Sequence, residues 1–117
     1  SKNSLTATTA GGAGNSLTAT INADETTNNI AVSGGGSNSV NLNLTSNKAT
    51  NSITMDGASN SLSLTQSGVA GTNGHAFTYN VTGSNNSMTA VQSGTIDTTV
   101  NVLSSGSCNT WNITTGN

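Results

Sequence analysis

The sequence predicts an all-β fold, a single-chain β-solenoid of about five coils with two short strands per coil and two facing, parallel, in-register sheets. Three observations support this prediction. A short motif, Asn-Ser followed by an apolar residue, recurs along the chain in two interleaved phases. Apolar and polar residues alternate after each copy, which is typical of strands with one buried face. Glycine-rich clusters separate these segments, and no segment has the 3.6-residue apolar period of a helix.

The motif repeats with a period of 22 to 26 residues. In the first phase the spacings are 23, 22, 26 and 23 residues, and the positions are Asn15, Asn38, Asn60, Asn86 and Asn109. In the second phase the spacings are 25, 23, 24 and 23 residues, and the positions are Asn3, Asn28, Asn51, His75 and Thr98. A fixed period in this range indicates equivalent stacked units. Residues 1–117 are therefore expected to form one repeat domain, with coils at 3–27, 28–50, 51–74, 75–97 and 98–117.

The strands are expected where apolar and polar residues alternate after the motif. The clearest segments, in chain order, are 17–21, 40–44, 62–64, 77–81 and 100–102. Their Leu, Val, Ile, Ala and Met residues would form a thin core between the sheets. Clusters such as Asp56-Gly57 and Ser105-Gly106 predict turns, because glycine adopts the positive φ that sharp corners need. Residues 69–74 form the longest insertion and predict an outward loop.

The recurring asparagine predicts an amide ladder. In a parallel, in-register stack each amide side chain can bond to the copy above and the copy below. His75 and Thr98 are then structural substitutes for asparagine in the second phase. A second pair of amides, Gln66 and Gln92, follows Asn60 and Asn86 with five residues between. The corresponding position in the other coils is held by Ile21, Leu44 and Thr115.

The composition excludes several classes of protein. The chain has 19 Asn, 18 Ser and 21 Thr, so half of its residues are small and polar, yet a formal charge of −2 and the absence of proline favour order over disorder. Lys2 and Lys48 are the only cations, too few for a nucleic-acid footprint. No apolar run is long enough to span a membrane. Because the sequence starts at Ser1 without a hydrophobic signal region, we expect a processed mature form or a piece of a longer protein.

No residue pattern indicates catalysis, a cofactor or a metal. His75 is the only histidine and has no cysteine or carboxylate cluster near it in the sequence. Cys108 holds the turn position of Asn85, so it is interpreted as an inert turn residue, with a bond to the Cys108 of another subunit or an introduced labelling site as alternatives. The acidic residues lack the spacing of a calcium loop and are expected in solvated turns; they are Asp24, Glu25, Asp56 and Asp97.

The aromatic residues are expected to be structural. Phe77 and Tyr79 share one strand face with Val81, and that face should be the core. Trp111 falls at the register of the core position Leu17, which favours core or end-cap packing over a carbohydrate-stacking surface. The protein is therefore expected not to be an enzyme and to have no small-molecule ligand.

Two half-coils carry a family resemblance. The segments from Asn60 to Gln66 and from Asn86 to Gln92, each followed by Ser-Gly, resemble curlin repeats, the building unit of bacterial curli and of related fibre and phage structural proteins. The period and the strand-turn-strand layout are similar over the whole chain, whereas the glutamine is matched only in these two segments. The resemblance implies an extracellular, self-assembling structural protein.

Three functions are compared. The leading hypothesis is a structural protein that self-assembles head to tail, through exposed end strands, into an extracellular fibre. Neither end carries a helix, a proline or a charge cluster that would block stacking, and the two phases continue into a following copy, because eleven residues lead from Asn109 to its Asn3. A phage fibre, tail or capsid-surface module is the first alternative. An ice-binding solenoid is the second, suggested by Thr6-Ala-Thr8 and Thr18-Ala-Thr20, although the outward pairs change from coil to coil.

Overall fold

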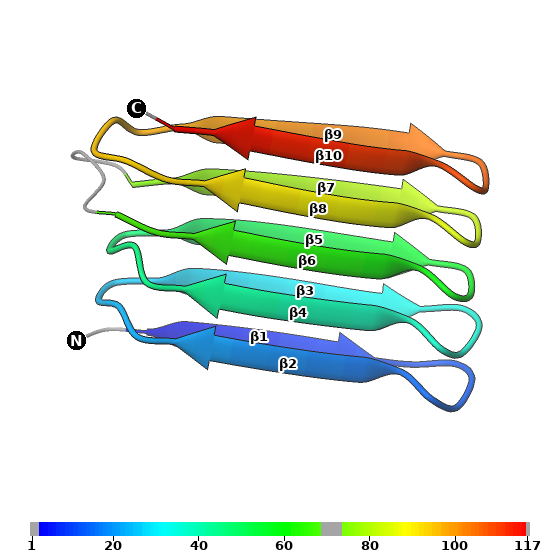
Figure 1. Ribbon diagram of the computed structural model, residues 1–117. Helices are drawn as coiled ribbons and strands as arrows, with labels where there is room; N and C mark the ends of the chain where they lie inside the picture. Colours follow the sequence, from blue (N-terminus) through cyan, green and yellow to red (C-terminus); the bar gives the residue numbers. More distant parts are fainter. Residues whose placement is uncertain (1–2, 69–73, 117) are drawn as a thin grey trace.

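The computed structural model describes residues 3–68 and 74–116, and these form ten strands and no helix (Figure 1). Within these ranges there is accordingly no helix long and apolar enough to cross a membrane. The strands are β1 (Ser4–Thr9), β2 (Ser16–Ile21), β3 (Thr27–Ser33), β4 (Ser39–Leu44), β5 (Thr50–Asp56), β6 (Ser61–Gln66), β7 (Ala76–Thr82), β8 (Ser87–Gln92), β9 (Thr99–Ser105) and β10 (Thr110–Thr115).

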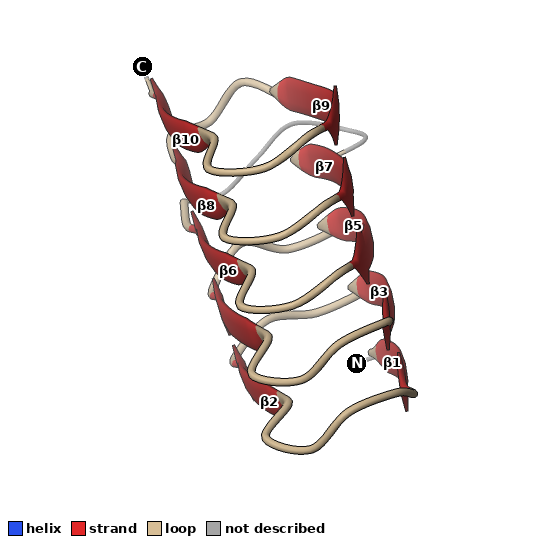
Figure 2. Cartoon of the chain, turned by 90° about the vertical axis from the view of Figure 1, so that its right-hand side faces the viewer, coloured by secondary structure: helices blue, strands red, loops and turns tan. Residues whose placement is uncertain are grey.

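The strands build two five-stranded sheets that face each other. The odd-numbered strands form one sheet in the order β1-β3-β5-β7-β9, and the even-numbered strands form the other in the order β10-β8-β6-β4-β2. Every neighbouring pair is parallel. The chain passes from one sheet to the other at every corner and climbs one strand per coil (Figure 2). The predicted β-solenoid of about five coils with two parallel sheets is confirmed.

The register gives the true period of each sheet. In the even sheet, Ser16 pairs with Ser39, Ser39 with Ser61, and Ser61 with Ser87, as the first phase predicts. Both sheets lengthen by the same amount at one coil, between β6 and β7, where the predicted loop lies. Residues 69–73 of that loop fall outside the described part of the chain.

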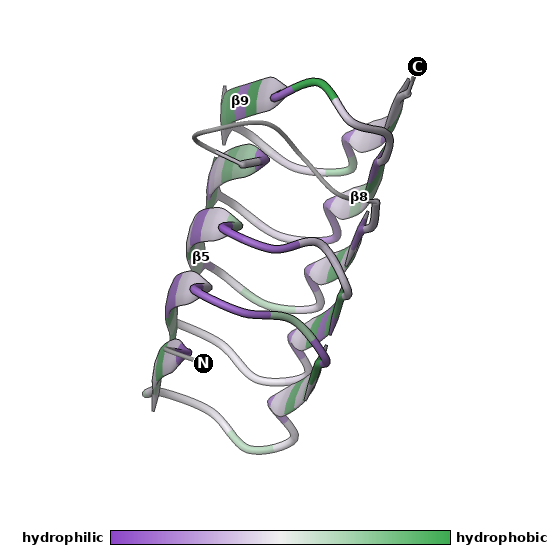
Figure 3. Cartoon of the chain, turned by 90° about the vertical axis from the view of Figure 1, so that its left-hand side faces the viewer, coloured by the Kyte–Doolittle hydropathy of each residue, from purple (hydrophilic) through white to green (hydrophobic). Residues whose placement is uncertain are grey.

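The core is a single apolar layer between the sheets. Alternate side chains of each strand point inward, and Figure 3 shows the resulting bands of hydrophobic and hydrophilic residues along the strands. In the three middle coils these inward residues are buried almost completely. The largest of them are Tyr79, Phe77, Ile30, Leu42, Leu44, Ile53, Met55, Leu62, Leu64 and Met88. Phe77 stacks beside Tyr79, whose ring meets Trp111 edge-on with 6.2 Å between centroids, so the aromatic residues pack in the core region as predicted.

Candidate functional site

The turns between odd and even strands place the first asparagine column. Each turn begins at a glycine with positive φ, such as Gly34 at 91°. The residue immediately before the asparagine is also left-handed, as in Ser59 and Cys108, with φ of 59° and 63°. A Cβ on Gly34 would lie 2.5 Å from the backbone nitrogen of Gly57, so the close stacking of turns excludes a side chain there. Two left-handed residues bring the chain back on itself and deliver the asparagine at the inner edge of the next strand.

The first asparagine column is hydrogen-bonded from end to end. The Oδ1 atom of each asparagine accepts the backbone N–H of the asparagine one coil later, at 2.9 to 3.0 Å. In three of these four steps the Nδ2 group of the later residue donates to the same oxygen, at 3.1 to 3.2 Å. The column consists of Asn15, Asn38, Asn60, Asn86 and Asn109.

Each amide in this column also bonds to the turn of the coil above. Nδ2 of Asn38 donates to the carbonyl of Gly57 at 2.9 Å, and Asn60 and Asn86 donate likewise to Gly83 and Gly106 at 2.9 and 3.0 Å. The asparagine therefore satisfies both a strand-end N–H and a turn carbonyl that would otherwise be buried without a partner. This double role explains why an amide, with one donor group and one acceptor group, recurs at this position.

The second-phase column does not exist as predicted. Asn28 pairs with Leu5 and not with Asn3, and Asn51 pairs with Phe77 and not with His75. Asn3 instead caps the next coil at Thr26, whose backbone N–H and hydroxyl both donate to its Oδ1, at 3.1 and 3.0 Å. The true column, extended from the strand register, is Asn3, Thr26, Ala49, His75 and Thr98.

The error is a shift of two residues in the second and third coils. A shift of two keeps every side chain on its own face of the sheet, so the apolar-polar alternation cannot reveal it. Asn28 and Asn51 are inward-facing strand residues, each 1% exposed, and do not stand at the turn edge. The coils accordingly begin at Thr26 and Ala49, and not at Asn28 and Asn51.

The misplaced asparagines form part of a buried polar chain that the sequence did not predict. Asn51 donates to Oδ1 of Asn28 and to Oε1 of Gln66, both at 2.8 Å. Gln66 donates to Oε1 of Gln92 at 2.7 Å. Because Asn51 belongs to β5 and Gln66 to β6, the chain joins the two sheets through the core. Polar residues at inward strand positions were the available signal, since buried amides require partners.

His75 closes this chain. Gln92 donates to the hydroxyl of Thr98 at 3.1 Å, and that hydroxyl lies 2.7 Å from Nδ1 of His75. Nε2 of His75 lies 3.2 Å from the carbonyl oxygen of Ser67, which can only accept. His75 is thus assigned as the Nε2–H tautomer, with Nδ1 accepting from Thr98. The imidazole is fully buried, and both nitrogens are engaged within the fold.

Three buried polar atoms have no partner among the described residues, namely Asn51 Oδ1, Tyr79 OH and Thr115 Oγ1. The Tyr79 hydroxyl is enclosed by the apolar layer, and burial raises its pKa from 10.0 to about 12. These atoms lie between packed strands, and no acid, base or nucleophile stands beside them in the hydrogen bonds described above. They are costs of packing and not the elements of a reactive centre.

The other polar residues do not gather into a site. In residues 3–68 and 74–116, no group of three His, Cys, Asp or Glu side chains could hold a metal ion. Cys108 is exposed at the turn position of Asn85, as its sequence register predicts. The outward column at the middle of the even sheet is mixed and consists of Thr18, Asn41, Ser63, Thr89 and Asn112.

The two ends of the stack are open. The outer strands β1 and β2 at one end, and β9 and β10 at the other, each have one neighbour among the described strands. Inward residues that are buried in the middle coils are partly exposed here, including Leu17, Ile21, Val102, Trp111 and Ile113. Leu5 is 45% exposed, although it stands in the same column as the fully buried Phe77.

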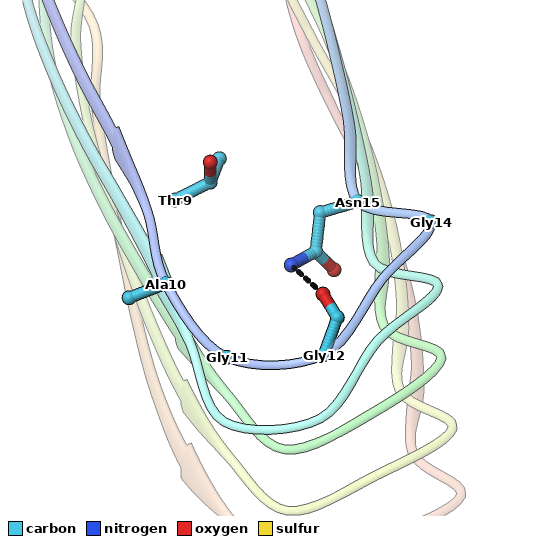
Figure 4. A pocket seen from close by; sticks show the side chains of 6 residues that line it. All are labelled: Thr9, Ala10, Gly11, Gly12, Gly14 and Asn15. Carbon is cyan, nitrogen blue, oxygen red and sulfur yellow. Dashed lines mark hydrogen bonds between the residues drawn. The ribbon is translucent and has the colours of Figure 1, made fainter.

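A hollow of about 200 Å³ opens at the turn of the first coil (Figure 4). It is lined by Thr9, Ala10, Gly11, Gly12, Gly14 and Asn15. The side chain of Asn15 reaches into the turn and donates to the carbonyl of Gly12 at 3.2 Å. In the coils above, the equivalent turn carbonyls also receive the asparagine of the coil below, so the hollow marks where the column has its lower end.

Comparison with known proteins gives no relative: no family model, curated protein or solved structure matches this chain. The assignment therefore stands on the register and hydrogen bonds of the chain itself, which define a two-sheet parallel β-solenoid.

Proposed function

We propose that this protein is a non-catalytic structural subunit that assembles end to end into a fibre. One observation carries the proposal. The same inward positions are sealed in the middle coils and open to solvent at both ends, and each sheet ends there in a strand with a single described neighbour. Another coil of the same pattern would bury these side chains and pair these strand edges.

The energetic terms favour such stacking. Burial of apolar surface contributes about 25 cal/mol per Å², and an exposed strand edge offers a row of backbone donors and acceptors to a partner. The net charge of −2 sets little repulsion against association of copies. Within the chain, every coil already stacks on its neighbour through eight parallel strand pairings in total, so a junction would repeat contacts that the fold makes internally.

The curlin-like segments support an extracellular fibre. Gln66 and Gln92, the residues that carry the resemblance, stack at 2.7 Å in the core. A cross-β stack with paired amides has the stability that a structure exposed outside the cell requires. The same geometry would serve in a phage fibre, tail or capsid-surface module, for which the open ends are an equal recommendation.

Sedimentation velocity over a concentration series tests this proposal. Residues 1–117 are expected to form species that grow with concentration, and electron micrographs of the same samples should show unbranched fibres of constant width. A chain that sediments as a folded monomer at every concentration, including the millimolar range, would overturn it.

A further inference from the structure

Building on the proposed end-to-end assembly, we propose that Asn109 of one copy docks into the hollow at the first coil of the next copy, in the register of the internal asparagine column. The partner of this surface is a second copy of the chain, stacked with its β1 on β9 and its β2 on β10. The proposal names the residues that meet at the junction and excludes stacking of two like ends.

The internal column supplies the rule for the junction. At each step the lower asparagine uses its Oδ1 to accept the next backbone N–H, and its Nδ2 to reach a turn carbonyl one coil above, as Asn86 does with Asn109 and Gly106. The left-handed residue before the asparagine donates its N–H downward, as Cys108 does to the carbonyl of Ser84 at 3.0 Å. These contacts recur with nearly constant lengths, so they define a single relation between neighbouring coils.

The upper end presents one half of this relation. Asn109 donates its backbone N–H and its Nδ2 to Asn86, at 3.0 and 3.2 Å. Its own Oδ1 stands where Asn86 Oδ1 stands one coil below, and no described coil lies above it. Trp111 and Val100 belong to the same end, and Trp111 is only partly buried.

The lower end presents the other half. Gly11 begins its turn with φ of 103°, as Gly34 and Gly106 begin theirs, so its carbonyl is the acceptor that a lower asparagine would reach. The backbone N–H groups of Gly14 and Asn15 occupy the positions that donate downward in every later coil. The hollow of about 200 Å³ lies between these groups.

Applying the internal rule across the junction gives three hydrogen bonds. Asn15 N–H donates to Asn109 Oδ1, Asn109 Nδ2 donates to the Gly11 carbonyl, and Gly14 N–H donates to the Ser107 carbonyl. The same register sets Leu17 beside Trp111 and Leu5 beside Val100, so the exposed Leu5 is covered. Polar and apolar contacts at the junction therefore agree on one alignment, with no shift of two residues.

Cysteine crosslinking tests the alignment, because Gly14 and Cys108 would be direct neighbours. Stacked parallel strands place equivalent Cα atoms about 4.8 Å apart, which is within the range that a disulfide spans. A Cβ at Gly14 meets nothing closer than Ser37 Oγ at 3.4 Å, and Cys108 itself has the left-handed φ that this position needs. Gly14→Cys fibres treated with oxidised glutathione, which accepts the two electrons, are expected to give a ladder of covalent multimers on a non-reducing gel.

The controls separate this proposal from the general one. Gly14→Cys with Cys108→Ser carries one thiol and should give no ladder, and Gly14→Ser, which matches Ser37, checks folding and assembly. Assembly without a ladder would overturn the alignment and leave end-to-end assembly standing. Disulfide dimers of the unmodified chain within its fibres would indicate that two upper ends meet, which also overturns it. A monomer at all concentrations would overturn both proposals.

A matched pair of charge changes on one strand end gives a second test. Asn109→Asp replaces the donor that would face the Gly11 carbonyl, whereas Asn112→Asp adds the same charge on the outward face of β10. We expect the critical concentration for assembly to rise about tenfold or more for Asn109→Asp and to change little for Asn112→Asp. Equal effects of the two variants would contradict the proposed contact.

Discussion

Asn51 donates a hydrogen bond to Oε1 of Gln66 at 2.8 Å, and this bond joins β5 to β6 across the core. Both side chains are buried, at 1% and 0% exposure. Apolar contacts between the sheets have no direction, and the alternation of side chains tolerates a slide by two residues. A directed bond between two buried amides is satisfied in one alignment only, so we infer that it fixes how the two sheets are set against each other.

Replacing Gln66 tests this role. Gln66→Leu should fit sterically, since Leu44 holds the same column one coil earlier. It leaves the Asn51 amide and the Gln92 carbonyl without a partner, so the free energy of unfolding is expected to fall by about 1–3 kcal/mol. Urea unfolding measures the change, with Ser61→Ala on the outward face as control. A Gln66→Leu protein as stable as the control would show that the bond adds nothing.

The asparagine column should contribute most in the middle of the stack. Asn60 accepts two bonds from Asn86 and donates to Gly83, whereas Asn15 lies at the open end and is only half buried. Asn60→Ala is expected to lower the free energy of unfolding by about 2–3 kcal/mol, and Asn15→Ala by about 1 kcal/mol or less. Thermal unfolding of the two variants at low concentration compares them. An equal loss at both positions would contradict the ladder interpretation.

The Tyr79 hydroxyl is predicted to weaken the fold at high pH. Its pKa is near 10.0 in the unfolded chain and about 12 in the fold, so its contribution is complete below pH 10 and is lost as the pH rises towards 12. Tyr79→Phe removes a buried hydroxyl without a partner and should raise the stability at neutral pH by about 1 kcal/mol. It should also remove the share of alkaline destabilisation due to this group. Unfolding measured at pH 7 and pH 11 decides, and a less stable Tyr79→Phe at pH 7 would contradict this.

The turn glycines allow backbone strain to be separated from steric clash. Gly34 and Gly106 both have positive φ, at 91° and 120°. A Cβ on Gly34 would come within 2.5 Å of Gly57, whereas on Gly106 its nearest contact is Asn109 Nδ2 at 3.7 Å. Gly106→Ala is expected to cost about 1–3 kcal/mol from strain alone, and Gly34→Ala clearly more. Denaturant midpoints compare them, and similar values would show that the turns shift apart without cost.

The sequence predicted the architecture well because the period is written twice. The first-phase asparagines sit beside left-handed turn residues, and their spacing follows the register of the even sheet without error. The second phase was misread at Asn28 and Asn51 because an inward position accepts either an amide or an apolar residue. The bond between Asn51 and Gln66 joins residues of different strands, and no spacing in a single phase reveals which inward amides meet across the core.

X-ray diffraction from aligned fibres of residues 1–117 tests the central claim, end-to-end stacking of coils, most directly. The account predicts a strong meridional reflection at about 4.8 Å, because the strands would lie across the fibre axis and repeat along it. An additional meridional repeat of about 24 Å is expected from five coils per copy. A fibre with the 4.8 Å spacing on the equator, or a preparation that forms no fibre at all, would contradict it.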